Sequence, residues 1–480
     1  MPLIIGAKSA SASTGVANSC RFNKPDDANL SRTQGAPTEA KNFTISVWTK
    51  RGNMGDLGGG DYPAMMSYYL AADTARGNLS FGSDDKLNFN SNPTGSSWLN
   101  IQVTDRVFRD PSAWYHIVVA VDTTAVEANR AKIWVNGTLQ TLNNTIGTGD
   151  MDLGWSVNTH THEVGREATV SGGTNEFDGY MAEVCFIDGT TYAASDFGEF
   201  DEDSPIIWKP KDVSGLTFGN NGFYLNFEDS ADLGADVSGN SNDLTEGNLD
   251  ATDQATDTPA NNFATWNPLI YGAASLTLAN GNNAITAVAD TSYYSIYGTI
   301  PVSTGKWYWE MEAVNVDSAS NRMSWGIGDI ENVQNANPGE VGDKSNGWTW
   351  DSAGGYKTGG SGGQDSSDYT TYTTGDILMF ALDCDNAKLY LGNNGTWQDS
   401  GDPTSGATGT GAISITADLT YAPAGNMRYA SNQAAINFGG SPGFTVSSAN
   451  QDADGYGNFE YAVPSGYYAL CTKNLGAYGG

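Results

Sequence analysis

Two glutamates in one apolar run come closest, by type and spacing, to an acid–base pair. Glu310 and Glu312 stand one strand repeat apart, so an extended chain places both on one face. Glycoside hydrolysis with retention needs two carboxyl groups about 5–5.5 Å apart. The same strand would turn Trp307, Trp309 and Met311 inward. A solvated sheet face is the commoner place for such glutamates, so we expect Glu310 and Glu312 to face solvent without catalysing.

A histidine pair offers metal-ligand chemistry. His160 and His162 flank Thr161 and would share a strand face, where two imidazoles could hold a metal ion. His116 is the third and last histidine, so such a site would need carboxylates to complete it. We expect surface or structural histidines.

One polar loop is rich in oxygen donors. Asp236, Asn240, Asn242 and Asp243 lie close together around a glycine, and calcium takes six to eight oxygen ligands from flexible loops. The spacing does not follow the EF-hand pattern, and Asp, Asn, Ser and Gly are also common turn formers. A calcium site and an ordinary turn both remain open.

Aromatic side chains beside a glycine-rich stretch are candidates for ligand binding. Trp348, Trp350 and Tyr356 precede residues 358–363, and flat rings can stack on sugars or anchor protein interfaces. Trp348 and Trp350 are also one strand repeat apart, which fits packing inside a core. For Tyr356 the two alternatives are more evenly balanced.

The segments that must position these residues have strand patterns. Phe43, Ile45 and Val47 alternate with polar residues, and residues 114–122 form a more continuously apolar run, as expected where both faces are covered. Asn136-Gly137 between apolar runs predicts a hairpin with a primed turn. A further strand near 222–228 is expected to return to the same domain. The chain is therefore predicted to be all-β.

Composition limits the function classes. The 480 residues carry 23 Lys and Arg against 55 Asp and Glu, a formal net charge of -32 that disfavours nucleic acid as a partner. The four cysteines form no CxxC pair, which argues against a disulfide framework or a zinc site. No apolar run reaches the ~18 residues of a membrane span. The first eight residues lack the basic start and apolar core of a secretory signal.

The change of character along the chain predicts two domains. A stretch rich in Asp, Thr, Asn and Ala interrupts the strand patterns before they resume. We place a first sandwich at 1–250, a polar connector at 251–266 and a second sandwich at 267–480.

Both halves resemble known families. Residues from about Ser19 to Tyr192 resemble a laminin-G-like, concanavalin-type lectin domain, through the motifs at 43–48, 114–119, 132–137 and 177–184. Residues from about Asn267 to Leu475 resemble a SPRY domain, through the motifs at 305–310, 324–328, 347–351, 375–378 and 394–396. Their order is similar to that in marine bacteriophage structural proteins. The resemblance implies two tandem antiparallel jelly-roll β-sandwiches.

These resemblances imply binding without catalysis. Lectin-like domains hold sugar or protein at rim loops, sometimes with calcium, and SPRY domains bind proteins through loops. We expect a virion surface protein, such as a tail fibre, head fibre or decoration subunit, made in the host cytoplasm. Its partners would be host glycan and other virion proteins, and it would form a homo-oligomer. A lectin-like glycosidase and a purely architectural capsid or tail subunit are the alternatives.

Overall fold

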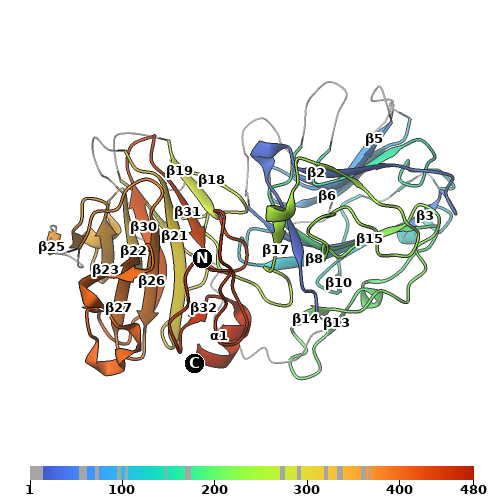
Figure 1. Cartoon of the computed structure of the whole chain (residues 1–480). Coiled ribbons are helices and arrows are strands. Elements are labelled where there is room, and N and C mark those ends of the chain that lie inside the picture. The colour runs from blue at the N-terminus through green and yellow to red at the C-terminus, as the bar shows by residue number, and fades with distance from the viewer. Residues whose placement is uncertain are drawn as a thin grey trace. The chain divides into compact units, whose positions relative to one another are not determined.

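The computed structural model describes residues 15–479 except 53, 55–61, 71–74, 95–98, 103–105, 145, 148, 168–174, 271–275, 289–292, 318–322, 332–338, 358–363 and 367–368. The segment examined for a secretory signal lies outside the described residues. The chain divides into two compact units, Ser11–Ala260 and Asn261–Gly480. Both are built from antiparallel sheets, and the all-β prediction is confirmed (Figure 1).

The first unit contains two large sheets and one small hairpin. The eight-stranded sheet runs β10 (Thr138–Leu139), β9 (Ala131–Val135), β8 (Trp114–Asp122), β3 (Asn42–Arg51), β12 (Gly179–Asp188), β1 (Ser19–Phe22) and β17 (Gln254–Ala255), with β15 (Phe223–Leu225) on β12. The seven-stranded sheet runs β16 (Thr245–Gly247), β2 (Asn29–Thr33), β11 (Thr161–Val164), β4 (Ala64–Tyr69), β5 (Arg76–Phe81), β6 (Leu87–Asn92) and β7 (Leu99–Gln102). The hairpin pairs β13 (Gly198–Phe200) with β14 (Trp208–Pro210).

The core of the first unit draws on the alternating residues of both sheets. Phe43 of β3 packs near Phe89 of β6, and Trp155 stacks on both rings. Asn136 and Gly137 have φ values of 48° and 73°, which forms the predicted primed turn between β9 and β10. The strand expected near 222–228 is β15, which pairs with β12.

A second apolar layer covers the outer face of the eight-stranded sheet. Val118 and Cys185 point away from the core and pack with Phe197, Val213 and Phe218. This layer explains why residues 114–122 are apolar on both faces. It buries polar alternates of β3 as well, such as Thr44, whose hydroxyl donates to the Thr190 carbonyl.

The second unit is also a pair of sheets. The nine-stranded sheet runs β18 (Leu276–Ala279), β19 (Ala284–Ala287), β31 (Gln433–Asn437), β21 (Lys306–Asn315), β26 (Ile377–Asp383), β27 (Lys388–Asn393) and β28 (Thr396–Trp397), with β29 (Ile413–Ser414) on β27 and β32 (Tyr468–Ala469) on β21. The six-stranded sheet runs β20 (Tyr294–Tyr297), β30 (Tyr421–Met427), β22 (Met323–Asp329), β23 (Gly347–Asp351), β24 (Tyr356–Lys357) and β25 (Gln364–Ser366).

Helical turns are short among the described residues. The 3₁₀ turns are η1 (Lys24–Asp26), η2 (Glu127–Asn129), η3 (Ala194–Asp196), η4 (Ala251–Asp253), η7 (Val341–Asp343), η8 (Gln398–Ser400) and η9 (Pro403–Thr408), and the α-helix is α1 (Thr472–Tyr478). Within that part of the chain, none of these has the length and apolar character to cross a bilayer.

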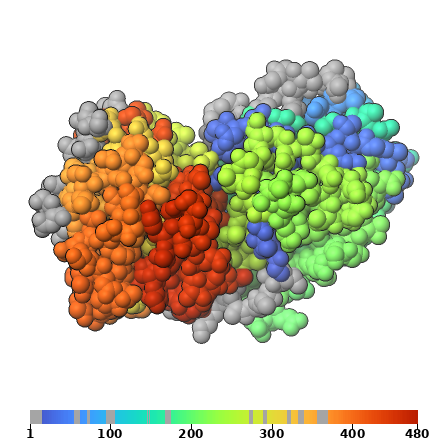
Figure 2. Space-filling view, in the orientation of Figure 1, coloured from blue at the N-terminus to red at the C-terminus, as the bar shows by residue number. Residues whose placement is uncertain are grey.

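The inward face of β21 is as the sequence predicts, but its outer face is not. Trp307, Trp309 and Met311 lie in the core between the sheets. The outer face is covered by a C-terminal layer in which Tyr308 packs with Phe459. Figure 1 shows β32 and α1 of this red segment beside β21, and Figure 2 shows its atoms forming a continuous surface of the unit.

Glu310 is therefore buried, and the expectation that it faces solvent is wrong. Its side chain is 0% exposed and accepts hydrogen bonds from the backbone nitrogens of Glu460 and Tyr461, both at 2.8 Å. The Tyr308 hydroxyl donates to the same carboxylate at 2.8 Å. Glu312 is half-buried. The C-terminal layer supplies hydrogen-bond donors that offset the free-energy cost of burying the Glu310 carboxylate.

The segment predicted as a connector carries structure. Gln254 and Ala255 pair with β1 of the first unit, and Asp257 forms a 2.6 Å ion pair with Lys50 of β3. Further along, Ala264 donates its backbone N–H to the Leu470 carbonyl of the second unit. The chain thus passes from one unit to the other near Ala260.

Candidate functional site

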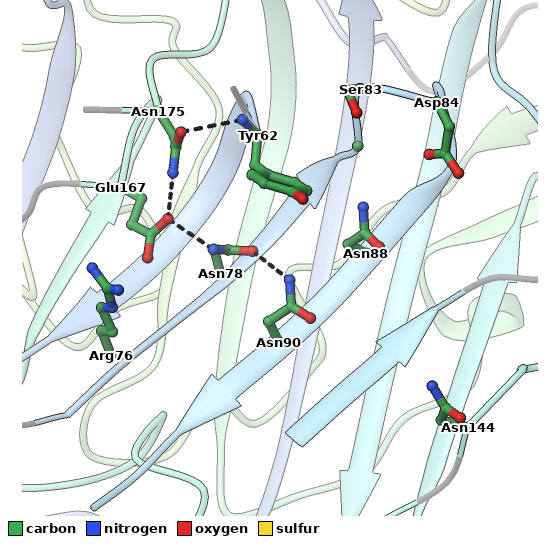
Figure 3. Close-up of a pocket in the computed structure, with 11 residues that line it drawn as sticks. Tyr62, Arg76, Asn78, Ser83, Asp84, Asn88, Asn90, Asn144, Glu167 and Asn175 are labelled. Carbon is green, nitrogen blue, oxygen red and sulfur yellow. Dashed lines mark hydrogen bonds between the residues drawn. The ribbon is translucent and has the colours of Figure 1, made fainter. Parts of the chain in front are cut away.

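A polar pocket opens on the outward face of the seven-stranded sheet. It encloses about 600 Å³, a size suited to a small ligand. Figure 3 shows its residues projecting from β5, β6 and the neighbouring loops. The lining residues are Tyr62, Arg76, Asn78, Gly82, Ser83, Asp84, Asn88, Asn90, Asn144, Glu167 and Asn175.

Strand alternation places the amides in this pocket. Leu87 and Phe89 of β6 turn inward to the core, so Asn88 and Asn90 turn outward. Asn78 of β5 lies directly opposite Asn90 in the antiparallel register. Core packing therefore fixes the backbone from which the pocket's amides project.

Glu167 is the centre of the hydrogen-bond network in the pocket. Its Oε2 accepts from Asn78 Nδ2 at 2.8 Å and from Asn175 Nδ2 at 2.7 Å. Asn78 Oδ1 in turn accepts from Asn90 Nδ2 at 3.2 Å. Asn175 Oδ1 accepts from the Tyr62 backbone nitrogen at 3.1 Å. Four side chains from separate segments are therefore held in one network, drawn as dashed lines in Figure 3.

One pocket amide is left with an unused donor. Asn88 is 6% exposed, and its Nδ2 atom is buried with no hydrogen-bond partner. A buried donor without a partner costs about 1–3 kcal/mol. A ligand oxygen that accepted from Asn88 would remove this cost, so the atom marks a point where the pocket is incomplete by itself.

An aromatic ring and a glycine shape the opening. The Tyr62 side chain lines the pocket and is 42% exposed, which leaves ring surface for stacking. A Cβ atom on Gly82 would lie 2.7 Å from Asn88 Nδ2 and 2.8 Å from an Asp84 carboxylate oxygen. The absence of a side chain at Gly82 thus keeps the space beside Asn88 open.

The two carboxylates of the pocket are not arranged as a facing pair. Figure 3 shows Glu167 and Asp84 at opposite sides, with Asn78 and Asn88 between them. Glu167 already accepts two amide donors through one oxygen, and Asp84 is exposed and accepts from the Lys86 backbone nitrogen. The arrangement suits hydrogen bonding to a polyhydroxyl ligand better than proton transfer across a glycosidic bond.

The predicted aromatic site is not a surface cluster. Trp348 is 6% exposed and meets the Tyr421 ring edge-on, while Trp350 is 0% exposed and donates from Nε1 to the Thr370 carbonyl. Both belong to the core between the sheets, the alternative reading of their spacing. Tyr356 begins β24, but its side chain lies outside the described residues.

The predicted calcium ligands do lie close together, in a loop that is held by its own hydrogen bonds. The two oxygens of Asp236 accept from the backbone nitrogens of Tyr224, Ser238 and Asn242 and from the Ser238 hydroxyl. Asp243 accepts from the Asp236 backbone nitrogen at 2.9 Å. Hydrogen-bond donors therefore occupy the positions around Asp236 that a cation would need.

The two asparagines of that loop turn their amide nitrogens toward the chain. Asn240 and Asn242 both donate to the Gly222 carbonyl, at 2.9 and 2.8 Å. Among the described residues, no three His, Cys, Asp or Glu side chains cluster closely enough to hold a metal. The contacts of the loop favour its turn-forming role, and calcium binding there stays a prediction.

The histidine pair is part of the fold. His160 Nδ1 lies 2.7 Å from the Gly154 carbonyl, and His162 Nε2 lies 2.7 Å from the Trp155 carbonyl. Burial lowers the pKa of His162 to about 3. His116 is also fully buried, between Ser46 and Trp208. The structural interpretation of the histidines is confirmed.

The pocket itself was missed by sequence reasoning. A signal was available in residues 87–92, where Asn88, Asn90 and Asn92 alternate with Leu87 and Phe89. The contribution of Glu167 and Asn175 carries no comparable local pattern, because only the fold brings them to β5.

Comparison with known proteins assigns part of the chain to a class. Residues 25–194 match a family model, Laminin_G_3, described as the concanavalin A-like lectin/glucanases superfamily. The pocket-bearing unit thus contains a concanavalin-like domain. No curated protein sequence matches the chain.

Solved structures similar to parts of the chain have low identity. The SPRY domain of human HERC1 is 13% identical with a TM-score of 0.27, and the match covers 34% of this chain and 91% of that one. A heptameric SAP-like pentraxin from Limulus polyphemus is 15% identical with a TM-score of 0.29, covering 38% and 80%. A Bacteroides ovatus protein to which carbohydrate binding is provisionally ascribed is 16% identical with a TM-score of 0.31, covering 49% and 60%.

Proposed function

We propose that this protein is a non-enzymatic recognition protein that binds glycan in the pocket of its first unit. The observation that most directly supports this proposal is a cavity of about 600 Å³ lined by five asparagines, one of which has a buried donor without a partner. Saccharide hydroxyls both donate and accept hydrogen bonds, and amides offer both partners. The match of residues 25–194 to a lectin-like family supports the same role.

The biological setting is the finer part of the proposal. The protein acts on a virion surface, as a tail fibre, head fibre or decoration subunit, and contacts host glycan and neighbouring virion proteins as a homo-oligomer. The resemblance of the two sandwiches, in this order, to bacteriophage structural proteins supports this setting. Mass spectrometry of purified virus particles would test this setting, and particles that lack the chain would contradict it.

Binding at the pocket is tested with a glycan array followed by calorimetric titration of the best oligosaccharide. Asn88→Ala removes the unused donor and is expected to weaken binding about tenfold, the effect of losing one good hydrogen bond. Asn129→Ala is the matched control, because Asn129 is exposed and lies outside the pocket lining. Equal affinity in both variants and the unaltered protein would contradict binding in this pocket.

Catalysis is tested on the same oligosaccharide. The proposal expects no release of reducing ends during prolonged incubation. Release that Glu167→Gln abolished would replace the recognition role with that of a lectin-like glycosidase.

A further inference from the structure

The direction of the hydrogen bonds around Glu167 is set by its carboxylate. An ionised carboxylate only accepts, so Asn78 and Asn175 must both present their Nδ2 atoms to Oε2. Asn78 then presents Oδ1 to Asn90, which must donate from its own Nδ2. The side-chain oxygen of Asn90, Oδ1, consequently remains available as an acceptor.

The side of the pocket around Glu167 thus offers unused hydrogen-bond acceptors. Glu167 Oε1 receives no hydrogen bond from the described residues, and the side-chain oxygen of Asn90, Oδ1, likewise receives none. The unused donor, Asn88 Nδ2, projects from the next outward position along β6. A ligand must therefore bring donors to Glu167 and Asn90 and an acceptor to Asn88.

The charges of the pocket also disfavour a negatively charged ligand. Glu167 and Asp84 contribute two carboxylates, of which Asp84 lies 3.7 Å from Lys86 Nζ, and Arg76 is the one guanidinium among the described lining residues. Arg76 already has an interaction partner of its own. The chain as a whole carries a formal charge of -32. A second anion placed beside the nearly buried Glu167 would meet like charge and lose its hydration.

We infer that this pocket selects uncharged or amino sugars and rejects uronates, sialates and sulfated sugars. The inference rests on the proposed glycan-binding function and specifies its ligand class. Hydroxyl or ammonium groups donate to Glu167 and Asn90, and a hydroxyl, ring or acetamido oxygen accepts from Asn88. Tyr62 offers ring surface on which an uncharged sugar face can stack.

The test uses the unaltered full chain and pairs of sugars that differ at a single substituent, which is neutral in one member and charged in the other. Methyl glycosides of glucose, galactose and mannose are compared with the corresponding uronates and 2-amino sugars by ligand-observed NMR and calorimetric titration. At least one neutral or amino glycoside is expected to bind about tenfold or more tightly than its uronate. Equal or tighter binding of the uronates would overturn the selectivity and leave glycan binding intact. Failure of every glycoside to bind would overturn the selectivity, and a glycan array without any bound glycan would overturn the proposed function as well.

A variant that lacks the charge of Glu167 tests whether this residue causes the selectivity. Glu167→Gln is expected to weaken binding of the neutral sugar, because an amide frees the neighbouring asparagines to turn. It should also narrow the ratio of neutral to uronate affinity. Glu202→Gln removes the same charge at an exposed position outside the pocket and should leave the ratio unchanged. Parallel narrowing in both variants would show a general charge effect and overturn the assignment to Glu167.

If Glu167→Gln does not fold, Asn88→Asp gives an independent variant. It replaces the unused donor by an acceptor, to which a ring or acetamido oxygen cannot bind, and it should weaken binding of the preferred neutral sugar. Unchanged affinity in Asn88→Asp would overturn the assigned direction of the hydrogen bonds.

Discussion

Asn78 Nδ2 donates to Glu167 Oε2 at 2.8 Å, and this bond joins strand β5 to a segment that follows β11. The two side chains belong to residues that are 4% and 3% exposed. Because the carboxylate accepts only, the bond fixes which end of the Asn78 amide faces the pocket. A change at this contact should therefore alter both the stability of the first unit and the lining of the pocket.

Asn78→Asp should destabilise the first unit by about 3 kcal/mol, because two carboxylates would then meet with no donor between them. The measurement is urea unfolding followed by the reactivity of the buried Cys20 thiol. Asn144→Asp makes the same change at an exposed lining residue and should cost less than about 0.5 kcal/mol. Similar losses in both variants would remove the special role given to the Asn78–Glu167 bond.

Gly82→Ala should block the pocket with little loss of stability. The added methyl group would lie 2.7 Å from Asn88 Nδ2, so Asn88 or the ligand must move. We expect saccharide affinity to fall about tenfold or more, measured by calorimetric titration. Gly215→Ala is the control, since a Cβ there would meet nothing within 4 Å. Full affinity in Gly82→Ala would show that the ligand lies elsewhere.

The strands could be predicted because their signals are local. Phe43 and Ile45 alternate with polar residues, and Asn136-Gly137 encodes a primed turn in its own φ preferences. The inward face of β21 followed from the spacing of Trp307 and Trp309. Each of these depends on side-chain periodicity, which a strand imposes whatever lies around it.

What covers the outside of a sheet could not be predicted in the same way. The alternation that makes Glu310 an outward residue is correct, but the layer containing Phe459 and Tyr461 lies about 150 residues away in sequence. Nothing near Glu310 encodes that cover. The pocket was missed for a related reason, since Glu167 and Asn78 approach each other only through the strand order of the sheet.

Asp257 should behave as a structural residue despite lying in a polar, linker-like segment. Its carboxylate forms a 2.6 Å ion pair with Lys50, both side chains being 1% exposed, and accepts from Trp114 Nε1 at 3.1 Å. Asp257→Asn leaves the ammonium buried without its counter-charge, and we expect a loss of about 3–5 kcal/mol. Thermal and urea unfolding of the first unit would measure this loss.

The matched control is the pair of Lys41 and Asp150, which is also 2.6 Å long but has a side chain that is 77% exposed. Asp150→Asn should leave the stability of the first unit nearly unchanged, because solvent screens the pair. If Asp257→Asn cost as little, residues 251–260 would be a linker attached loosely to the first unit.

Glu310 should make the stability of the second unit depend on pH between about 5 and 8. Burial raises the pKa of its carboxyl to about 7 from an ordinary value of 4.5, outweighing the hydrogen bonds from Tyr461, Glu460 and Tyr308. The folded state therefore holds this proton more tightly than the unfolded chain. The resulting stabilisation is complete below pH 4.5 and is lost as pH rises through 7.

The expected loss is on the order of 3 kcal/mol over this window. The three histidines, His116, His160 and His162, all lie in the first unit, so none of them contributes to the slope of the second. Cys471 is fully buried and reports unfolding of the second unit when a thiol reagent active at both pH values is added at increasing urea concentrations.

Glu310→Gln should reduce the pH dependence of the second unit, because the amide keeps similar size and does not titrate. A smaller dependence remains from Glu312, whose pKa is also raised by burial. Glu331→Gln, at an exposed position of the same unit, should retain the slope of the unaltered protein. Tyr461 and Glu460 lie in the layer that covers β21, so weakening at pH 8 should begin with that layer. An undiminished slope in Glu310→Gln would assign the titration to another group and leave Glu310 with a structural role alone.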